Sequence, residues 1–267
     1  MVTFANAKIN IGLQVLHRRD DGYHELETVF YPLKIFDVLE VVEASETRLI
    51  PSGVSIPGDG QDNLCLKAYH LLQREYDLPP VQIYLHKTIP IGAGLGGGSA
   101  DAAFLLKLVN EKFNLGLSAS ELMRFALQLG ADCSFFIHNK PVLATGIGDV
   151  FNDITVDLSP YRLIVIKPEI NVSTKEAYSA VTPDSKGRQL ASAMALPVEE
   201  WRDAIVNDFE TGIFAKYPEI RAIKDFLYEN GAVFAAMSGS GSAVYGLFNE
   251  QVRLHGLNPA YTVFYVD

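Results

Sequence analysis

The sequence predicts a fold that mixes helices and strands, built as one large domain or as two lobes. Two observations support this. The chain has 267 residues, more than one domain usually contains. Segments with period-two alternation of apolar residues are also interspersed with segments of helical spacing. Pro160 marks the expected boundary, which gives lobes over residues 1–157 and 158–267.

Composition and charge exclude some classes of protein. Hydrophobic residues make up 48% of the chain, so it can bury a sizeable core. The 22 basic and 32 acidic residues give a net charge of −10, which argues against binding of nucleic acid or of an anionic membrane. Cys65 and Cys133 lie far apart and are expected to be buried free thiols.

No targeting signal is expected. The first residues lack the pattern of a signal peptide, and no apolar run approaches the roughly 18 residues of a membrane span. We therefore expect a cytoplasmic protein without a membrane partner. No apolar surface stripe indicates an oligomeric state.

The first half of the chain begins with strand signals. Ile9, Ile11, Leu13 and Val15 alternate within residues 7–16, which predicts a strand before a polar turn. The elements expected next are strand, turn and strand over residues 26–43, a loop or short hairpin at 45–62, a helix at 63–76 and a strand at 81–87.

Helix-start signals follow. Ser99 begins a helix expected to end at residue 113, and a capping box of Ser118 and Glu121 begins a second helix that stops at Gly130. The remaining elements expected are strands at 134–138, 142–145 and 162–167, helices at 174–181, 198–206 and 219–229, and strands at 232–237, 243–248 and 261–266.

A glycine-rich segment from Pro90 to Asp101 is the sharpest local feature, with five glycines within residues 92–98. It matches G-x-G-x-x-G, but a second helix follows where a dinucleotide-binding fold needs a parallel strand. A Walker loop would need a lysine. A flexible linker would not lie between an apolar strand and a strong helix. We therefore predict a phosphate cradle, in which glycine N–H groups and the helix N-terminus at Ser99 receive the anion.

Two other glycine clusters, at residues 144–149 and 238–242, are either hairpin turns or further loops around the same anion. Lys8 is either a solvated lysine or a functional one. Asp132 is expected between a helix C-terminus and an apolar strand, which opposes the helix dipole and indicates a function or a local hydrogen bond. Tyr23 and His24 follow a turn and either pack it onto the core or bind a ligand.

The segment from Pro90 to Ala103 resembles the phosphate-binding motif of the GHMP kinases, and the resemblance runs in order from residue 4 to about residue 250. The stretch from Asp21 to Phe30, which contains Asp-Gly-Tyr-His, resembles a branch that phosphorylates a cytidine diphosphate derivative of methylerythritol in non-mevalonate isoprenoid synthesis. Other matching stretches are Asp62–Leu64, Gly130–Asp132, Ala144–Gly146, Val172–Thr174, Asn207–Glu210, Tyr217–Ile220 and Met237–Gly241.

This resemblance implies a two-lobe α+β fold with the active site in the interlobe cleft. It also implies ATP and Mg²⁺ as cofactors, and γ-phosphoryl transfer to the 2-hydroxyl of the substrate. A GHMP-type kinase for another small alcohol and a non-catalytic nucleotide-binding module are the alternatives.

The resemblance also implies roles for individual residues. Asp132 would be the general base and Lys8 its partner, and Ser99 would contact the metal. The residues implied to bind ATP are Asn63, Pro90, Ile91, Gly92, Ala93, Gly94, Leu95, Gly96, Gly97, Gly98, Ser99 and Ala100. The residues implied to bind the substrate are Asn10, Tyr23, His24, Thr174 and Tyr178, with the three aromatic rings at the cytosine.

Three positions depart from the family pattern. Cys133 and Ser134 replace the usual Val-Pro after the catalytic aspartate, which leaves that backbone less stiff. Ala100 replaces a second serine and removes one possible phosphate or metal contact. Ile147 replaces a frequent arginine and removes a cationic contact.

Overall fold

The computed structural model describes residues 1–57, 62–183 and 190–266. Its contacts divide the chain into two compact units that interleave along the sequence. Unit 1 comprises Met1–Lys8, Lys34–Ile91 and Gly96–Lys140, and unit 2 comprises Ile9–Leu33, Gly92–Leu95 and Pro141–Asp267. The boundary expected at residues 157 and 158 stays a prediction.

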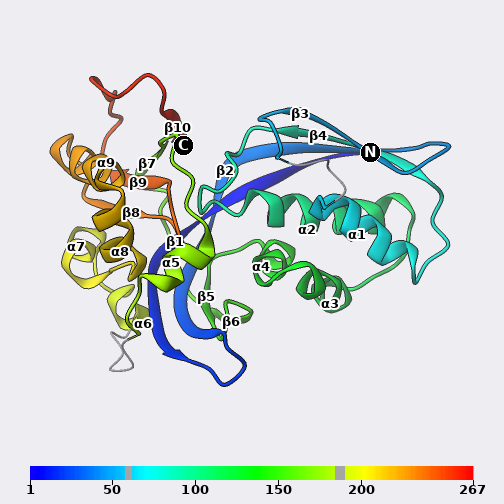
Figure 1. The fold of residues 1–267 in the computed structure, drawn as a ribbon, viewed down its shortest axis with the longest axis horizontal. Coiled ribbons are helices and arrows are strands. Elements are labelled where there is room, and N and C mark those ends of the chain that lie inside the picture. The colour runs from blue at the N-terminus through cyan, green and yellow to red at the C-terminus, as the bar shows by residue number, and fades with distance from the viewer. Residues whose placement is uncertain (58–61, 184–189, 267) are drawn as a thin grey trace. The chain divides into compact units, whose positions relative to one another are not determined.

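Two long strands, β1 (Val2–Arg18) and β2 (His24–Glu43), contribute residues to both units (Figure 1). β1 confirms the strand expected at residues 7–16. The turn expected within residues 26–43 is wrong, because β2 is continuous. Pro32 lies between the stretch of β2 that pairs with β5 and the stretch that pairs with β4, outside both of these paired stretches.

Unit 1 places four helices against strands. β4 (Val81–Lys87) pairs antiparallel with β2 and parallel with β3 (Arg48–Gly53). The helices are α1 (Leu64–Gln73), α2 (Gly97–Lys112), α3 (Ala119–Leu129) and α4 (Ala131–His138). They pack on one another along one side of β3 and β4 (Figure 1). β3 lies within the loop or hairpin expected at 45–62, of which residues 58–61 lie outside the described residues.

The strand expected at residues 134–138 is wrong, because these residues form the end of α4. Phe135, Phe136 and Ile137 are all buried, and a short apolar run without alternation does not distinguish a strand from a buried helix. Asp132 therefore lies in the first turn of a helix, where the positive end of the helix dipole favours a carboxylate.

Unit 2 contains an antiparallel sheet in the order β10-β7-β9-β8. Its strands are β7 (Arg162–Lys167), β8 (Phe234–Met237), β9 (Val244–Phe248) and β10 (Thr262–Val266), which confirms the four strands expected there. β5 (Val142–Thr145) pairs with β2 and with β6 (Val150–Asp153), and β6 is an element that the sequence did not predict.

The helices of unit 2 are α5 (Thr174–Ser179), α6 (Leu190–Ala193), a 3₁₀ turn (Val198–Glu200), α7 (Trp201–Ala204), α8 (Phe209–Lys216) and α9 (Pro218–Glu229). α6 and α8 were not predicted. Phe209, Ile213 and Ile223 pack with Ile164 and Val244 in one buried core, so α8 and α9 cover the sheet. The structure confirms the mixed α+β fold.

Within the described residues, the helices are all too short or too polar to cross a membrane.

Candidate active site

The glycine-rich loop passes from unit 1 into unit 2 at Gly92 and returns at Gly96. Gly94 has a φ of +74° and Gly96 a φ of +71°, a region that favours glycine. A Cβ on Gly94 would lie 1.9 Å from the carbonyl oxygen of Ser238, and one on Gly96 would lie 2.9 Å from Cζ of Phe136. Both positions therefore require glycine for conformation and for space.

Helix α2 begins inside this loop, two residues before the expected start. Its N-cap is Gly96, which has no side chain to accept a bond from the first turn. The first-turn N–H groups of a helix have no intrahelical acceptor, and here they belong to Gly97, Gly98 and Ser99. Gly98 is exposed, and a Cβ there would meet only Leu64 Cδ1, at 3.9 Å. This helix end suits a phosphate group.

Ser99 also contacts the side chain of Cys133. Burial raises the pKa of the Cys133 thiol to about 11, and a hydrogen bond with Ser99 opposes this rise. Cys65 and Cys133 are both buried and free, as the sequence predicted.

The predicted base and its partner lie together in unit 1. Lys8 Nζ is 3.6 Å from Asp132 Oδ2, and the side chains are 5% and 41% exposed. Burial lowers the pKa of Lys8, while the charge of Asp132 and a hydrogen bond to it raise that pKa. The pair thus combines a buried ammonium group with a carboxylate that solvent and ligands can reach.

A second group of charges in unit 1 was not predicted. Lys87 Nζ donates to Asp101 Oδ2 at 2.7 Å and also to Asp37, and all three side chains are buried. The other oxygen of Asp37 accepts from the backbone N–H of Thr88 and of Ile89, at 2.5 and 2.9 Å. Burial raises the pKa of Asp101 to about 7, against the lowering effect of Lys87. This group anchors the chain just before the glycine-rich loop.

The glycine cluster at residues 238–242 is hydrogen-bonded to the glycine-rich loop within unit 2. The Ser238 hydroxyl accepts from the backbone N–H of Asn10 at 3.1 Å and donates to the carbonyl oxygen of Gly94 at 2.8 Å. The N–H of Ala243 donates to the carbonyl oxygen of Ala93 at 3.1 Å. Asn10 is buried, and its side chain donates to Thr28 Oγ1 at 3.0 Å.

Two of the three predicted cytosine-binding rings are in contact. His24 stacks on Tyr178 with ring centroids 4.8 Å apart and an interplanar angle of 16°. The two rings are too close for a base to enter between them, and the Tyr178 ring also contacts the Phe209 ring, with centroids 4.9 Å apart. Tyr23 lies in the turn before β2 and is 62% exposed.

The glycine cluster at residues 144–149 is hydrogen-bonded to the residues that follow His24 in the chain. The N–H of Gly146 donates to Glu25 Oε1 at 2.9 Å, and the N–H of Leu26 donates to the Gly146 carbonyl oxygen at 2.9 Å. This loop therefore supports the start of β2.

Two other predicted residues lie at helix N-termini. Asn63 is the N-cap of α1, and its side-chain oxygen accepts from the N–H of Cys65 at 2.8 Å. Thr174 is the exposed first residue of α5, which Ser173 caps by accepting from the N–H of Glu176 at 3.2 Å.

Within the described part of the chain, no group of three or more His, Cys, Asp and Glu side chains could hold a metal ion. Mg²⁺ typically binds through one or two protein ligands together with substrate phosphates and water. The Ser99 hydroxyl and the Asp132 carboxylate are oxygen ligands of the kind that Mg²⁺ accepts.

Comparisons with known proteins agree with these features. Residues 63–140 match the model of the GHMP kinases N terminal domain, and residues 190–254 match that of the GHMP kinases C terminal domain. The chain is 51% identical over 258 residues to 4-diphosphocytidyl-2-C-methyl-D-erythritol kinase of Bacteroides fragilis, covering 95% of this chain and 94% of the relative.

One solved structure gives the same family, and a second shares the fold. The crystal structure of a 4-(cytidine 5'-diphospho)-2C-methyl-D-erythritol kinase matches with a TM-score of 0.77 and 34% identity, covering 92% of this chain and 90% of the other. The Methanococcus jannaschii mevalonate kinase shares the fold, with a TM-score of 0.70 and 15% identity over 93% of this chain and 90% of its own. The glycine-rich loop, the α2 N-terminus and the sequence identity thus place this chain in the GHMP kinase family, within its branch of 4-diphosphocytidyl-2-C-methyl-D-erythritol kinases.

Proposed function

We propose that this chain transfers the γ-phosphoryl group of ATP to the 2-hydroxyl of 4-diphosphocytidyl-2-C-methyl-D-erythritol. The observation that carries the chemistry is the pair formed by Lys8 and Asp132, whose charged atoms are 3.6 Å apart. The identity of 51% to a relative with that name supports this substrate.

Asp132 is the proposed general base. A tertiary alcohol is a weak acid, so a carboxylate must accept its proton as the oxygen attacks phosphorus. The Lys8 ammonium group and the N-terminus of α4 both place positive charge beside this carboxylate. The Lys8 ammonium group also stabilises negative charge that develops on the attacking oxygen.

The N–H groups at the start of α2 and the Ser99 hydroxyl are the proposed contacts of the ATP phosphates. Mg²⁺ carried by ATP would neutralise phosphate charge and would contact Ser99. Asn63 is proposed near the adenine and Asn10 near the reacting end of the substrate. Tyr23, His24 and Tyr178 are proposed at the cytosine, and Thr174 is proposed as a further substrate contact.

A coupled assay of ADP release tests the substrate. We expect turnover with the cytidyl substrate, and ³¹P spectra should place the new phosphate on the 2-hydroxyl. Mevalonate and homoserine serve as competing alcohols. Faster turnover of either one, or ADP release that is independent of any alcohol, would contradict the assignment.

The Asp132→Asn variant tests the base, with the exposed Asp225→Asn as a matched control. We expect loss of turnover by at least about 100-fold, the lower end for a general base. ATP binding measured by calorimetry should be retained. Turnover at the wild-type level in Asp132→Asn would exclude the proposed mechanism.

A further inference from the structure

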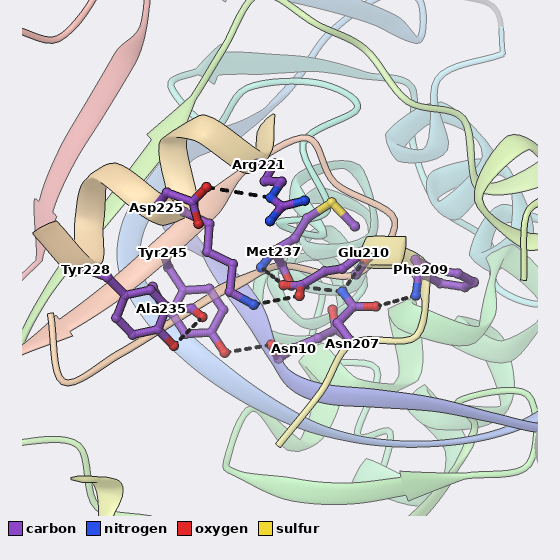
Figure 2. A network of polar contacts seen from close by, with 12 residues as sticks. Asn10, Asn207, Phe209, Glu210, Arg221, Asp225, Tyr228, Ala235, Met237 and Tyr245 are labelled. Atoms are coloured by element: carbon purple, nitrogen blue, oxygen red, sulfur yellow. Dashed lines mark hydrogen bonds and ion pairs between the residues drawn. The ribbon is translucent and has the colours of Figure 1, made fainter. Parts of the chain in front are cut away.

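The stretch Asn207–Glu210 forms part of a polar network in unit 2 that the proposed function does not use (Figure 2). Asn207 is buried, and its side-chain Nδ2 donates to two carbonyl oxygens of one turn, that of Met237 at 2.9 Å and that of Gly239 at 2.8 Å. Its Oδ1 accepts from the N–H of Phe209 at 3.0 Å, which fixes the orientation of the amide. Asn207 thus holds both sides of Ser238.

Glu210 holds the same turn from a second direction. Its Oε1 accepts from the N–H of Met237 at 2.8 Å, and its Oε2 accepts from Lys224 Nζ at 2.6 Å. The backbone N–H and carbonyl oxygen of Met237 are therefore both bonded to side chains of this stretch. A turn fixed at these points cannot shift without breaking buried hydrogen bonds.

The turn at Ser238 also fixes two segments of the proposed site, which contain Asn10 and Gly94. The Ser238 hydroxyl bridges the N–H of Asn10 and the carbonyl oxygen of Gly94. Tyr245, from β9, donates to the carbonyl oxygen of Asn10 at 3.0 Å (Figure 2). Asn10 is the proposed substrate contact, and Gly94 lies in the phosphate loop.

The same stretch is also bonded to β1. The N–H of Asp208 donates to the carbonyl oxygen of Leu13 at 2.8 Å, and Asp208 Oδ2 accepts from the N–H of Val15 at 2.8 Å. The segment Asn207–Glu210 is therefore bonded both to the strand that carries Asn10 and to the turn that bridges Asn10 to Gly94.

We propose that Asn207 and Glu210 are positioning residues for phosphoryl transfer, which act through Ser238 on Asn10 and Gly94. The inference rests on the proposed function. Since both side chains are buried and bonded within the protein, their loss should alter the alignment of acceptor and phosphate more than the binding of either. Small misplacements of reacting groups lower kcat steeply.

The test compares Asn207→Asp and Ser238→Ala with the wild type, and uses Arg221→Ala on the exposed side of α9 as a control. Asn207→Asp replaces the donor that faces two carbonyl oxygens with an acceptor, and Ser238→Ala removes only the bridging hydroxyl. We expect each variant to lower kcat by about 10- to 100-fold. The KM for each substrate should change by less than about threefold, and Arg221→Ala should match the wild type.

The double variant separates positioning from general stability. If both residues act through one bridge, Asn207→Asp combined with Ser238→Ala should lose little more than the worse single variant. Glu210→Gln should keep most of the activity that Glu210→Leu loses, because glutamine still offers an oxygen to the N–H of Met237. Activities are compared per folded molecule, well below the melting temperature.

The outcomes distinguish the two proposals. If the wild type turns over but folded Ser238→Ala and Asn207→Asp keep its kcat, the positioning inference is overturned and the proposed function stands. Fully additive losses in the double variant would also overturn it. If the wild type does not turn over the cytidyl substrate, the proposed function falls and the inference falls with it.

Discussion

In unit 1, Lys87 lies between the carboxylates of Asp37 and Asp101, whereas in unit 2 the amide of Asn207 holds a turn of main chain by its carbonyl oxygens. The first group contains two acidic side chains and one basic one, so its charges do not balance. Burial, together with the nearby charge of Asp37, raises the pKa of Asp101 to about 7 against the lowering effect of Lys87. The unit 1 anchor of the phosphate loop should therefore respond to pH, and the contribution of the Asn207 amide in unit 2 should not.

The most severe way to break the unit 1 anchor is to remove its cation. Lys87→Met leaves two buried carboxylates without their partner, which should lower the free energy of unfolding by about 3–5 kcal/mol. Urea unfolding at pH 7.5 measures this, with Lys34→Met on the exposed part of β2 as the control. A loss below about 1 kcal/mol would mean that the buried charges are not coupled as the contacts indicate.

The Asp101→Asn variant tests the pH dependence of stability. The pKa of Asp101 is about 7 in the folded chain and near its ordinary value of about 3.9 when unfolded, so the folded state binds this proton more tightly. Its contribution to the free energy of unfolding is thus fully present below about pH 4 and is lost as pH rises to about 7. A wild type and an Asp101→Asn variant with parallel stability curves from pH 4.5 to 7.5 would rule this out. Asp225→Asn is the control.

Breaking the unit 2 anchor should have a smaller effect on stability. Asn207→Ala leaves two carbonyl oxygens without their donor, which should cost about 1–3 kcal/mol. Because no ionisable group is lost, the difference from the wild type should be the same at pH 5 and pH 8. Asn230→Ala, which loses one bond to the carbonyl oxygen of Phe226, is the control. If the loss of stability in Asn207→Ala depended strongly on pH, the proposed difference between the two anchors would be contradicted.

The smallest effect is expected at Tyr23, which is exposed and anchors neither unit. Tyr23→Ala should leave stability unchanged and raise the KM for the cytidyl substrate about 3- to 10-fold, the value of one lost aromatic contact. The KM for ATP is the internal control. An equal rise in both KM values would contradict a role at the cytosine.

Much of the site follows from local sequence patterns. The glycine-rich loop and the helix that starts in it were predicted because glycines next to a helix start are a local signal. Asp37 and Lys87 were missed although a signal exists. Lys87 continues the alternation of the buried Val81, Ile83 and Leu85, and Asp37 lies in phase with the buried Ile35 and Leu39. A charged residue in the core phase of a strand predicts a buried ion pair.

Other features had no local signal. Glu210 lies in α8, a helix that the sequence did not predict, and its partner Met237 lies 27 residues away. Asp132 was assigned to a helix end because α4 is a short apolar run, whose type depends on tertiary packing. Local patterns thus predict the glycine-rich loop and the start of its helix, whereas the buried partners that hold them depend on tertiary packing.

The interleaving of the two units has a consequence for synthesis on the ribosome. The backbone of Leu13, near the N-terminus, bonds to Val206 and Asp208, nearly 200 residues later in the chain. Folding during translation proceeds from the N-terminus, so β1 emerges long before these partners exist. Unit 2 can be completed only late in translation. Neither unit is a continuous piece of chain, so no single cut releases one of them whole.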